Sequence, residues 1–394
     1  MKKLLIATAA LAMVAGTAQA QSSVTVYGII DTGYNSVENT RSNGVKVETN
    51  QVRTNGEGAT SRFGVRGSED LGGGLKANFV VEMGIGNTNA NNTASFTNFG
   101  DRAFWAGLES KDMGELRIGF QDTVIRSNWL AHDQLAAANV AGNLAHDQAG
   151  PANGAATTAS NLAAGSHSGR STAINYLSPR FNGAQLVLGV TQSEVDETGK
   201  AKVKTGSGSQ VGLSYVAGKF SAGVAYQEAT TVVAAANATG FFLNASGGAL
   251  TFPTTSLGAA AVIGQNTKNK ETSAAASYDL GVAKVAYIYN KRDSQNTAVT
   301  NDWASNIDRT SNSFSASVPV GAKTVLRAGY GFGELRQGGA TGYNADIKGM
   351  QAAVNYNLSK RTMAYAIYGD ESREIDASTK AKTKEYSVGV RHSF

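Results

Sequence analysis

In two short runs near residue 70, the charged side chains are separated by even numbers of positions. The stretch is ATSRFGVRGSEDLGGGLKANFVVEMG (59–84), in which Arg62 and Arg66 precede the glycines and Lys76 and Glu82 follow them. Successive residues of a strand point to opposite faces, so a hairpin here has one apolar face and one face with all four charges. Guanidinium groups stay protonated in proteins, and rings of them favour the passage of anions where they line a narrow pore.

This hairpin fits two kinds of protein. In a soluble β-sandwich the charges would meet water, and Phe63, Phe79 and Val81 would fill the core. In a membrane barrel the apolar face meets lipid and the charged face lines a water-filled interior. The hairpin alone does not decide between them.

The composition favours one large antiparallel β structure. The 394 residues would suffice for two or three domains, but with only four prolines and 16% charged residues no linker or charge block divides them. The 46 glycines and the turn signals at short intervals are typical of antiparallel sheets. The chain has no cysteine, which excludes a disulfide scaffold.

Residues 1–20 are predicted to be a secretory signal peptide. Lys2 and Lys3 form a basic start, an apolar run follows, and Ala18-Gln19-Ala20 is a small-x-small cleavage site. The mature chain, 21–394, is then expected to be a single domain. Losing Lys2 and Lys3 lowers its formal net charge from +5 to +3, too weak to indicate nucleic-acid binding.

About sixteen strands can be counted along the mature chain. Tight turns alternate with longer polar or glycine-rich loops, as in outer-membrane barrels with short periplasmic turns and long external loops. Backbone groups in lipid must be paired, so such a sheet must close. The sequence therefore predicts an all-β fold, a transmembrane antiparallel β-barrel of about sixteen strands. We expect a first strand at 24–34, a polar loop at 35–58, a strand at 102–109 with Trp105 facing away from Arg102, and a short helix around Trp129–Ala138.

Several motifs resemble the general porins of β-proteobacteria, within the trimeric Gram-negative porin family. The more specific ones are SRFGVRGSEDLG (61–72) and the terminal VGVRHSF (388–394), and INYLSPRFNGAQL (174–186) lies between them. The resemblance covers essentially the whole mature chain. It implies an outer-membrane porin of a Gram-negative bacterium, a homotrimeric channel for passive diffusion of small hydrophilic solutes and ions, in contact with lipid and lipopolysaccharide and inserted by the barrel assembly machinery.

The resemblance also implies a constriction. In the family the third external loop folds into the barrel, and here that loop corresponds to Gln121–Gly169. Family arginines match Arg62 and Arg102, with Arg170 the nearest match to a third, and the opposing carboxylate matches Glu82. Strand alternation adds Arg66 and Arg117 to the lumenal face, and the loop adds Asp122 and Asp133. The family usually has Gly-Arg where this chain has Gly119-Phe120, so one lumenal arginine is missing, and we expect only a modest anion preference.

Two His-Asp pairs in the loop, His132-Asp133 and His146-Asp147, leave two interpretations open. They could ligate a transition metal, or they could hold the loop to the wall by hydrogen bonds. No nucleophile elbow, HExxH or phosphate loop occurs in the required context, so neither an enzyme nor a cofactor is expected. A barrel enzyme, or an adhesin using loops such as Ala229–Asn266, is the alternative function.

The last strand ends in an alternating apolar face. Tyr386, Val388, Val390 and Phe394 share this face, and the chain ends on the aromatic carboxylate. The resemblance implies that the assembly machinery reads such an ending.

Deleting Phe394 is therefore expected to reduce insertion into the outer membrane while synthesis and export continue. The measurement is the amount of heat-modifiable trimer in the outer-membrane fraction, with Phe394→Tyr as the control that keeps an aromatic end. Normal trimer levels from the truncated chain would contradict the assembly role.

Overall fold

The computed structural model describes residues 22–40, 44–54, 56, 58–86, 100–136, 138–145, 169–195, 203–233, 265–296, 307–337, 343–374 and 380–394. The signal peptide, His146, Asp147 and most of the loop Ala229–Asn266 lie outside these residues. Within them, no helix is both long and apolar enough to cross a bilayer.

The described chain consists of strands and one helix. The first nine elements are β1 (Ser23–Thr40), β2 (Lys46–Arg53), β3 (Arg62–Gly72), β4 (Leu75–Gly84), β5 (Ala103–Ser110), β6 (Gly114–Asp122), α2 (Val124–His132), β7 (Arg170–Leu177) and β8 (Ala184–Val195). The remaining strands are β9 (Val203–Ala217), β10 (Phe220–Val233), β11 (Gln265–Asp279), β12 (Lys284–Asn296), β13 (Ile307–Val320), β14 (Thr324–Gln337), β15 (Tyr343–Asn357), β16 (Thr362–Glu374) and β17 (Lys380–Ser393).

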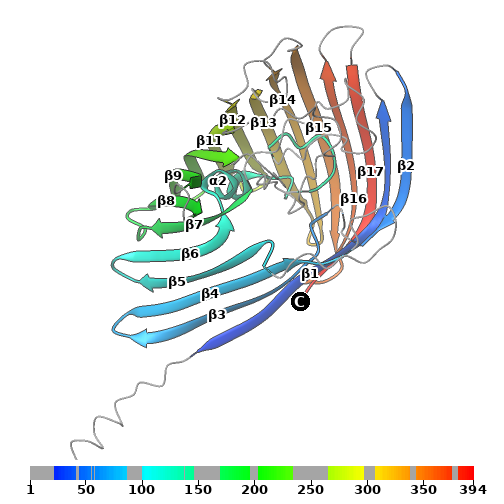
Figure 1. The fold of residues 1–394 in the computed structure, drawn as a ribbon. Helices are drawn as coiled ribbons and strands as arrows, with labels where there is room; N and C mark the ends of the chain where they lie inside the picture. The colour runs from blue at the N-terminus through cyan, green and yellow to red at the C-terminus, as the bar shows by residue number, and fades with distance from the viewer. Residues whose placement is uncertain are drawn as a thin grey trace, which may run out of the picture.

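The sheet closes on itself as a barrel (Figure 1). Each strand from β3 to β17 pairs antiparallel with the next, and β1 pairs with both β17 and β3, so sixteen strands complete the ring. Phe394 finishes the seam, where its backbone N–H and C=O exchange hydrogen bonds of 3.1 and 3.2 Å with Gly28. The predicted sixteen-stranded transmembrane barrel is confirmed.

The extra strand corrects the polar loop expected at 35–58. β1 continues to Thr40, and β2 pairs with its second half from Gly33↔Arg53 to Thr40↔Lys46. β2 carries mainly polar residues, KVETNQVR, so no apolar alternation marked it as a strand.

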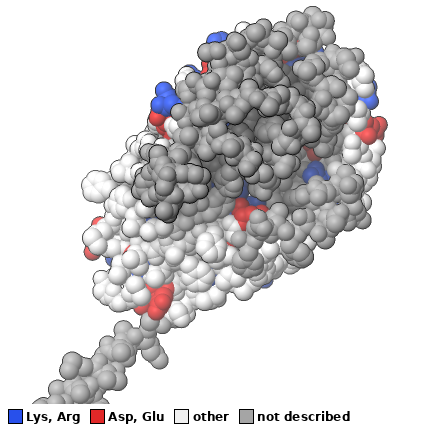
Figure 2. All heavy atoms as spheres, viewed as in Figure 1, with Lys and Arg blue, Asp and Glu red and all other residues white. Residues whose placement is uncertain are grey.

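The two faces of the barrel differ as expected for a wall in lipid. Large apolar side chains such as Val26, Phe104, Val224 and Val388 are about half exposed on the outer face. Paired inner positions carry small or polar residues, for example Asn175, Gln210 and Ser273. Figure 2 shows the outer wall largely uncharged, with its charged side chains mainly near the margins.

The chain after β6 packs on the inner wall. We call the described residues of 123–145 the internal segment; it begins with α2, which contacts β9–β12 (Figure 1). The predicted helix around Trp129–Ala138 is wrong in position, because α2 spans Val124–His132 with Thr123 as its N-cap. Val124, Ile125 and Trp129 pack with Ala225, Ala275 and Ile288 of the wall.

Glycines of the wall make room for the internal segment. A Cβ on Gly369 would lie 2.0 Å from the carbonyl oxygen of Ala141, and one on Gly223 would lie 2.0 Å from Oδ1 of Asn128. The wall glycines that meet the segment are Gly212 in β9, Gly223 in β10, Gly329 and Gly331 in β14, Gly349 in β15 and Gly369 in β16. The backbone of the segment therefore lies directly on the sheet at Gly349 and Gly369, and its side chains lie on the sheet at the other four glycines.

Hydrogen bonds from every second strand also hold the internal segment to the wall. Gln210 of β9 accepts from the N–H of Val124 (3.0 Å), and Ser273 of β11 accepts from Asn128 (2.9 Å). Further along, Ser315 of β13 accepts from the N–H of Gln134 (3.2 Å), Gln351 of β15 donates to the carbonyl of Val140 (2.8 Å), and Glu385 of β17 accepts from the N–H of Ala141 (2.8 Å). These bonds satisfy polar backbone groups that would otherwise be buried without partners.

Filling one glycine position should push the segment away from the wall. Gly369→Ala adds a methyl group within 2.0 Å of a backbone oxygen, so we expect the segment to shift toward the barrel axis and the single-channel conductance to fall. Gly212→Ala is the matched control, because its new Cβ would lie 3.3 Å from the Val124 side chain and needs only a small adjustment. Equal conductance in both variants and the wild type would contradict this packing.

Candidate functional site

Glu82 of β4 gathers three polar partners on the inner wall. Its Oε1 lies 2.7 Å from Nε of Arg102 and 3.9 Å from Nη1 of Arg62, and Tyr27 of β1 donates its hydroxyl to Oε2 at 3.0 Å. Arg62 also donates from Nε to the carbonyl oxygen of Thr60 (3.0 Å). Strand register explains the grouping, because Gly64 pairs with Glu82 and, having no side chain, leaves room for the ring of Tyr27.

Asp122, at the end of β6, holds two further guanidinium groups. Its Oδ1 lies 3.0 Å from Nε of Arg126 in the first turn of α2 and 2.9 Å from Nε of Arg170 at the start of β7. The N-cap of Thr123, which accepts from the N–H of Arg126 at 3.3 Å, sets the direction of that first turn. Asp122 and Arg170 are cross-strand partners, so the pair is fixed by the sheet as well.

These two groups form one arginine cluster, defined as Arg62, Arg102, Arg126 and Arg170 with Glu82 and Asp122. Burial lowers the pKa of the Arg126 guanidinium and the charge of Arg102 adds to this, whereas Asp122 opposes them. Arginine still remains protonated at neutral pH. The cluster therefore has four positive and two negative charges, an excess that attracts anions.

Three residues expected at the same place lie elsewhere. Arg66 is exposed over the ring of Tyr27 (5.3 Å), and Arg117 bonds Glu115 (2.5 Å), both nearer the tight turns. Asp133 follows α2, where it accepts from the N–H of Leu135 (2.9 Å) and from Asn143 (3.1 Å). Asp133 therefore ties the internal segment to itself.

The expectation that Trp105 faces away from Arg102 is wrong. Trp105 pairs with Gly119 on the inner face, and the Arg117 guanidinium stacks over its ring at 4.4 Å. Arg102 precedes the first residue of β5, Ala103, so strand alternation does not govern its direction. Both side chains therefore face the interior.

Sequence reasoning missed Arg126 and Tyr27. Arg126 stands where no strand register could be predicted, although its spacing of four from Asp122 is the spacing of a helical ion pair. Phe120 stands where the family usually has an arginine, and it pairs with Phe104 on the outer face. Arg126 thus supplies a lumenal guanidinium that the strand pattern does not contain.

His132 serves as a hydrogen-bonding residue. Its Nδ1 lies 2.8 Å from the carbonyl oxygen of Asn128, and its Nε2 lies 3.2 Å from the hydroxyl of Ser221 in β10. Among the described residues no group of three or more His, Asp and Glu side chains is arranged to hold a metal ion. These contacts favour the interpretation in which the His-Asp pair anchors the loop.

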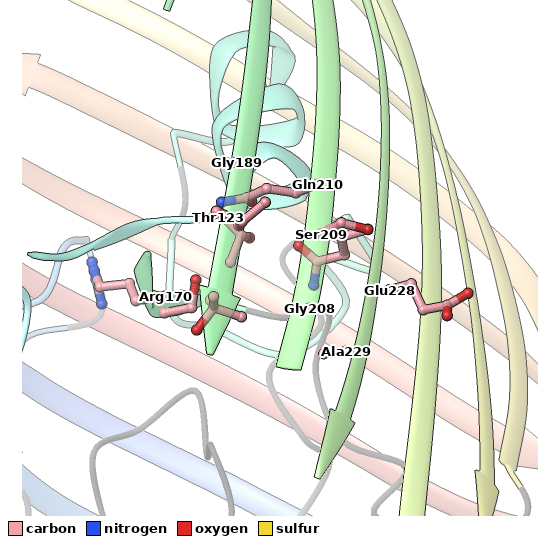
Figure 3. Close-up of a pocket in the computed structure, with 13 residues that line it drawn as sticks. Thr123, Arg170, Gly189, Gly208, Ser209, Gln210, Glu228 and Ala229 are labelled. Atoms are coloured by element: carbon pink, nitrogen blue, oxygen red, sulfur yellow. The ribbon is translucent and has the colours of Figure 1, made fainter. Parts of the chain in front are cut away.

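A small cavity lies beside the arginine cluster, between the start of α2 and strands β7–β10. Its volume is about 70 Å³, and it is lined by small and polar residues that include Thr123, Ser171 and Gln210. In Figure 3 the Arg170 side chain points away from Thr123 and Gln210. The guanidinium of Arg170 is therefore turned toward the cluster.

A closed barrel with an apolar outer wall and a charged interior defines a membrane channel of the outer-membrane type. The family profile described as Gram-negative porin matches residues 7–376. This chain belongs to the Gram-negative porin family, as its motifs predicted, and it is an outer-membrane porin that forms a channel.

Two relatives agree with this assignment, and a solved structure has a similar fold. The chain is 28% identical to an outer membrane porin protein of Bordetella pertussis and 32% identical to outer membrane porin protein 32 of Delftia acidovorans, with 100% of both chains covered in each comparison. The fold is similar to that of the anion-selective porin from Comamonas acidovorans, with a TM-score of 0.66 and 22% identity over 95% of this chain and 100% of that chain.

The His132 contacts predict a pH effect. Burial lowers the pKa of His132 below its usual value, so the folded protein binds this proton less readily than the unfolded chain does. The contribution of His132 to stability is thus complete above about pH 6.5 and decreases as the pH falls below it. We expect the unfolding temperature to fall more between about pH 7.5 and about pH 5 in the wild type than in His132→Gln. An equal fall in both proteins would contradict this role.

Proposed function

We propose that this porin passes small hydrophilic solutes and ions with a modest preference for anions, and that the arginine cluster is its selectivity filter. The observation that carries the proposal is the cluster's charge: four guanidinium groups share two carboxylates, Glu82 and Asp122. The similarity to a protein described as an anion-selective porin supports the same direction.

The placement of the cluster matters more than the net charge of the chain. Screening in physiological salt weakens a charge over about 8 Å, so a charged side chain on the wall of a wide pore acts weakly on ions at its centre. The internal segment brings Arg126 close enough to Arg62 and Arg102 for the three charges to act on one another. Arg66 and Arg117 on the same wall would extend the positive potential toward the tight turns, and we propose that Asp133 contributes only indirectly, through the internal segment.

Other properties of the protein follow from family membership. We propose that the mature chain, 21–394, is one barrel domain that assembles as a homotrimer after removal of residues 1–20. We propose further that it contacts lipopolysaccharide, that the assembly machinery reads Tyr386, Val388, Val390 and Phe394, and that it has no enzymatic activity. Tyr386, Val388 and Val390 are about half exposed on the outer face, where a partner protein could contact them.

Reversing two charges of the filter tests the proposal. In Arg62→Glu, Arg102→Glu the cluster carries four negative charges and two positive ones, so we expect anion preference to be lost or inverted, most steeply at low salt. The measurement is the reversal potential of single channels in planar bilayers under a KCl gradient.

The control is Arg336→Glu, the same charge change on an exposed residue that pairs with Glu334 on the outer side of β14. It should leave the reversal potential unchanged. A wild type that prefers cations, or a double variant with the reversal potential of the wild type, would refute the filter.

A further inference from the structure

The backbone ladder of β1 has a gap at Asp31. The strand pairs with β3 only up to Ile29 and with β2 only from Gly33, so residues 30–32 have no strand neighbour on that side. On the other side Asp31 pairs with Arg391 of β17. An open gap would leave an N–H and a C=O without partners in the membrane wall, where hydrocarbon offers no hydrogen bond in their place.

The chain between β2 and β3 fills this gap. We call the described residues of 54–61 the return segment. Ser61 accepts from the N–H of Asp31 at 2.9 Å, and its hydroxyl also lies 3.0 Å from the Asp31 carbonyl oxygen. The N–H of Gly56 donates to the same carbonyl oxygen at 2.8 Å. The backbone groups of Asp31 therefore hold the return segment at Gly56 and at Ser61.

The return segment lies inside the barrel. Asp31 belongs to the inner face, because its neighbour Ile30 is 49% exposed on the outer face, and yet Asp31 itself is 0% exposed. The residues that cover it include Gly56 and Gly58, where a Cβ would lie 1.6 Å and 2.8 Å from the Asp31 carboxylate oxygens. Tyr365 of β16 donates its hydroxyl to the same carboxylate at 2.6 Å. Only glycines permit this close approach.

One side chain connects the return segment to the internal segment. Nδ2 of Asn139 lies 3.1 Å from the carbonyl oxygen of Gly56 and 3.3 Å from Oγ1 of Thr60, so its two hydrogens have one acceptor each. The neighbouring Val140 packs with Tyr365 and Met363. Thr60 in turn accepts from Nε of Arg62 through its carbonyl oxygen.

We propose that the return segment is a second internal element of the channel and that Asn139 is a positioning residue, which fixes the internal segment against it and thereby holds Arg62 in the constriction. The covered Asp31 is the anchor of this arrangement. The consequence for ion selectivity rests on the function proposed above, whereas the contact between the two segments does not.

The first experiment tests the contact. Because the chain has no cysteine, Thr60→Cys, Asn139→Cys offers one thiol pair to a short thiol-specific crosslinker. We expect a crosslink between the two peptides in folded, heat-modifiable protein, detected by mass spectrometry, and none in either single variant. Folded protein without the crosslink would overturn the proposal.

The second experiment tests the positioning role with Asn139→Ala and with Thr60→Val, which removes only the Oγ1 acceptor. Both should increase open-channel current noise and shift the reversal potential under a KCl gradient toward zero. Ser317→Ala is the matched control, since Ser317 donates to Oε1 of Gln134 (3.1 Å) in the internal segment without touching the return segment.

The comparison of variants separates the outcomes. If the noise and the reversal potential change in Asn139→Ala and Thr60→Val but not in Ser317→Ala, the positioning role is supported. Equal changes in all three variants would mean only a general loosening of the internal segment and would overturn the positioning role. If the arginine cluster is not the filter, the noise and the crosslink still report on the contact. Unchanged noise in Asn139→Ala would refute the role of Asn139 in either case.

Discussion

Backbone pairing is the constraint on which the rest of this structure depends. A wall in lipid has no water to satisfy its N–H and C=O groups, so the sheet must close and each interruption must be repaired from within. β1 shows this most visibly, because it pairs with β17, β3 and β2 in turn. The repair at Asp31 draws a piece of chain into the interior, and the requirement for closure thus also shapes the lumen.

A second constraint applies to the interior: a polar segment can lie inside the barrel only where the wall gives it room and hydrogen-bond partners. The internal segment lies on wall glycines and takes hydrogen bonds from Gln210, Ser273, Ser315, Gln351 and Glu385. Its first turn can therefore present Arg126 to the same space as Arg62 and Arg102, although the three residues come from a helix, a strand and the approach to a strand. The charge excess of the cluster arises from this convergence.

The parts of the fold with period-two alternation could be predicted from the sequence. The hairpin around Arg62 and Glu82 and the tight turns between later strands fall where the pattern places them, because one face meets lipid and the other meets water. β2 was not predicted, because most of its residues on both faces are polar. The position of α2 depends on the Thr123 cap and on wall glycines that are distant in the chain, and Arg102 lies just outside the strand whose alternation would have aimed it. Such long-range packing leaves no local trace in a sequence.

The wall glycines have a consequence for how such proteins diversify. Gly223, Gly331, Gly349 and Gly369 belong to four different strands, yet each accommodates one short stretch of the same segment. A new side chain at any of them requires a matching change in the segment, and a segment transplanted from a relative needs its own glycines in the recipient wall. Strands and segment must therefore be inherited together, as one unit of exchange, while the lipid-facing positions between those glycines are free to vary among apolar residues.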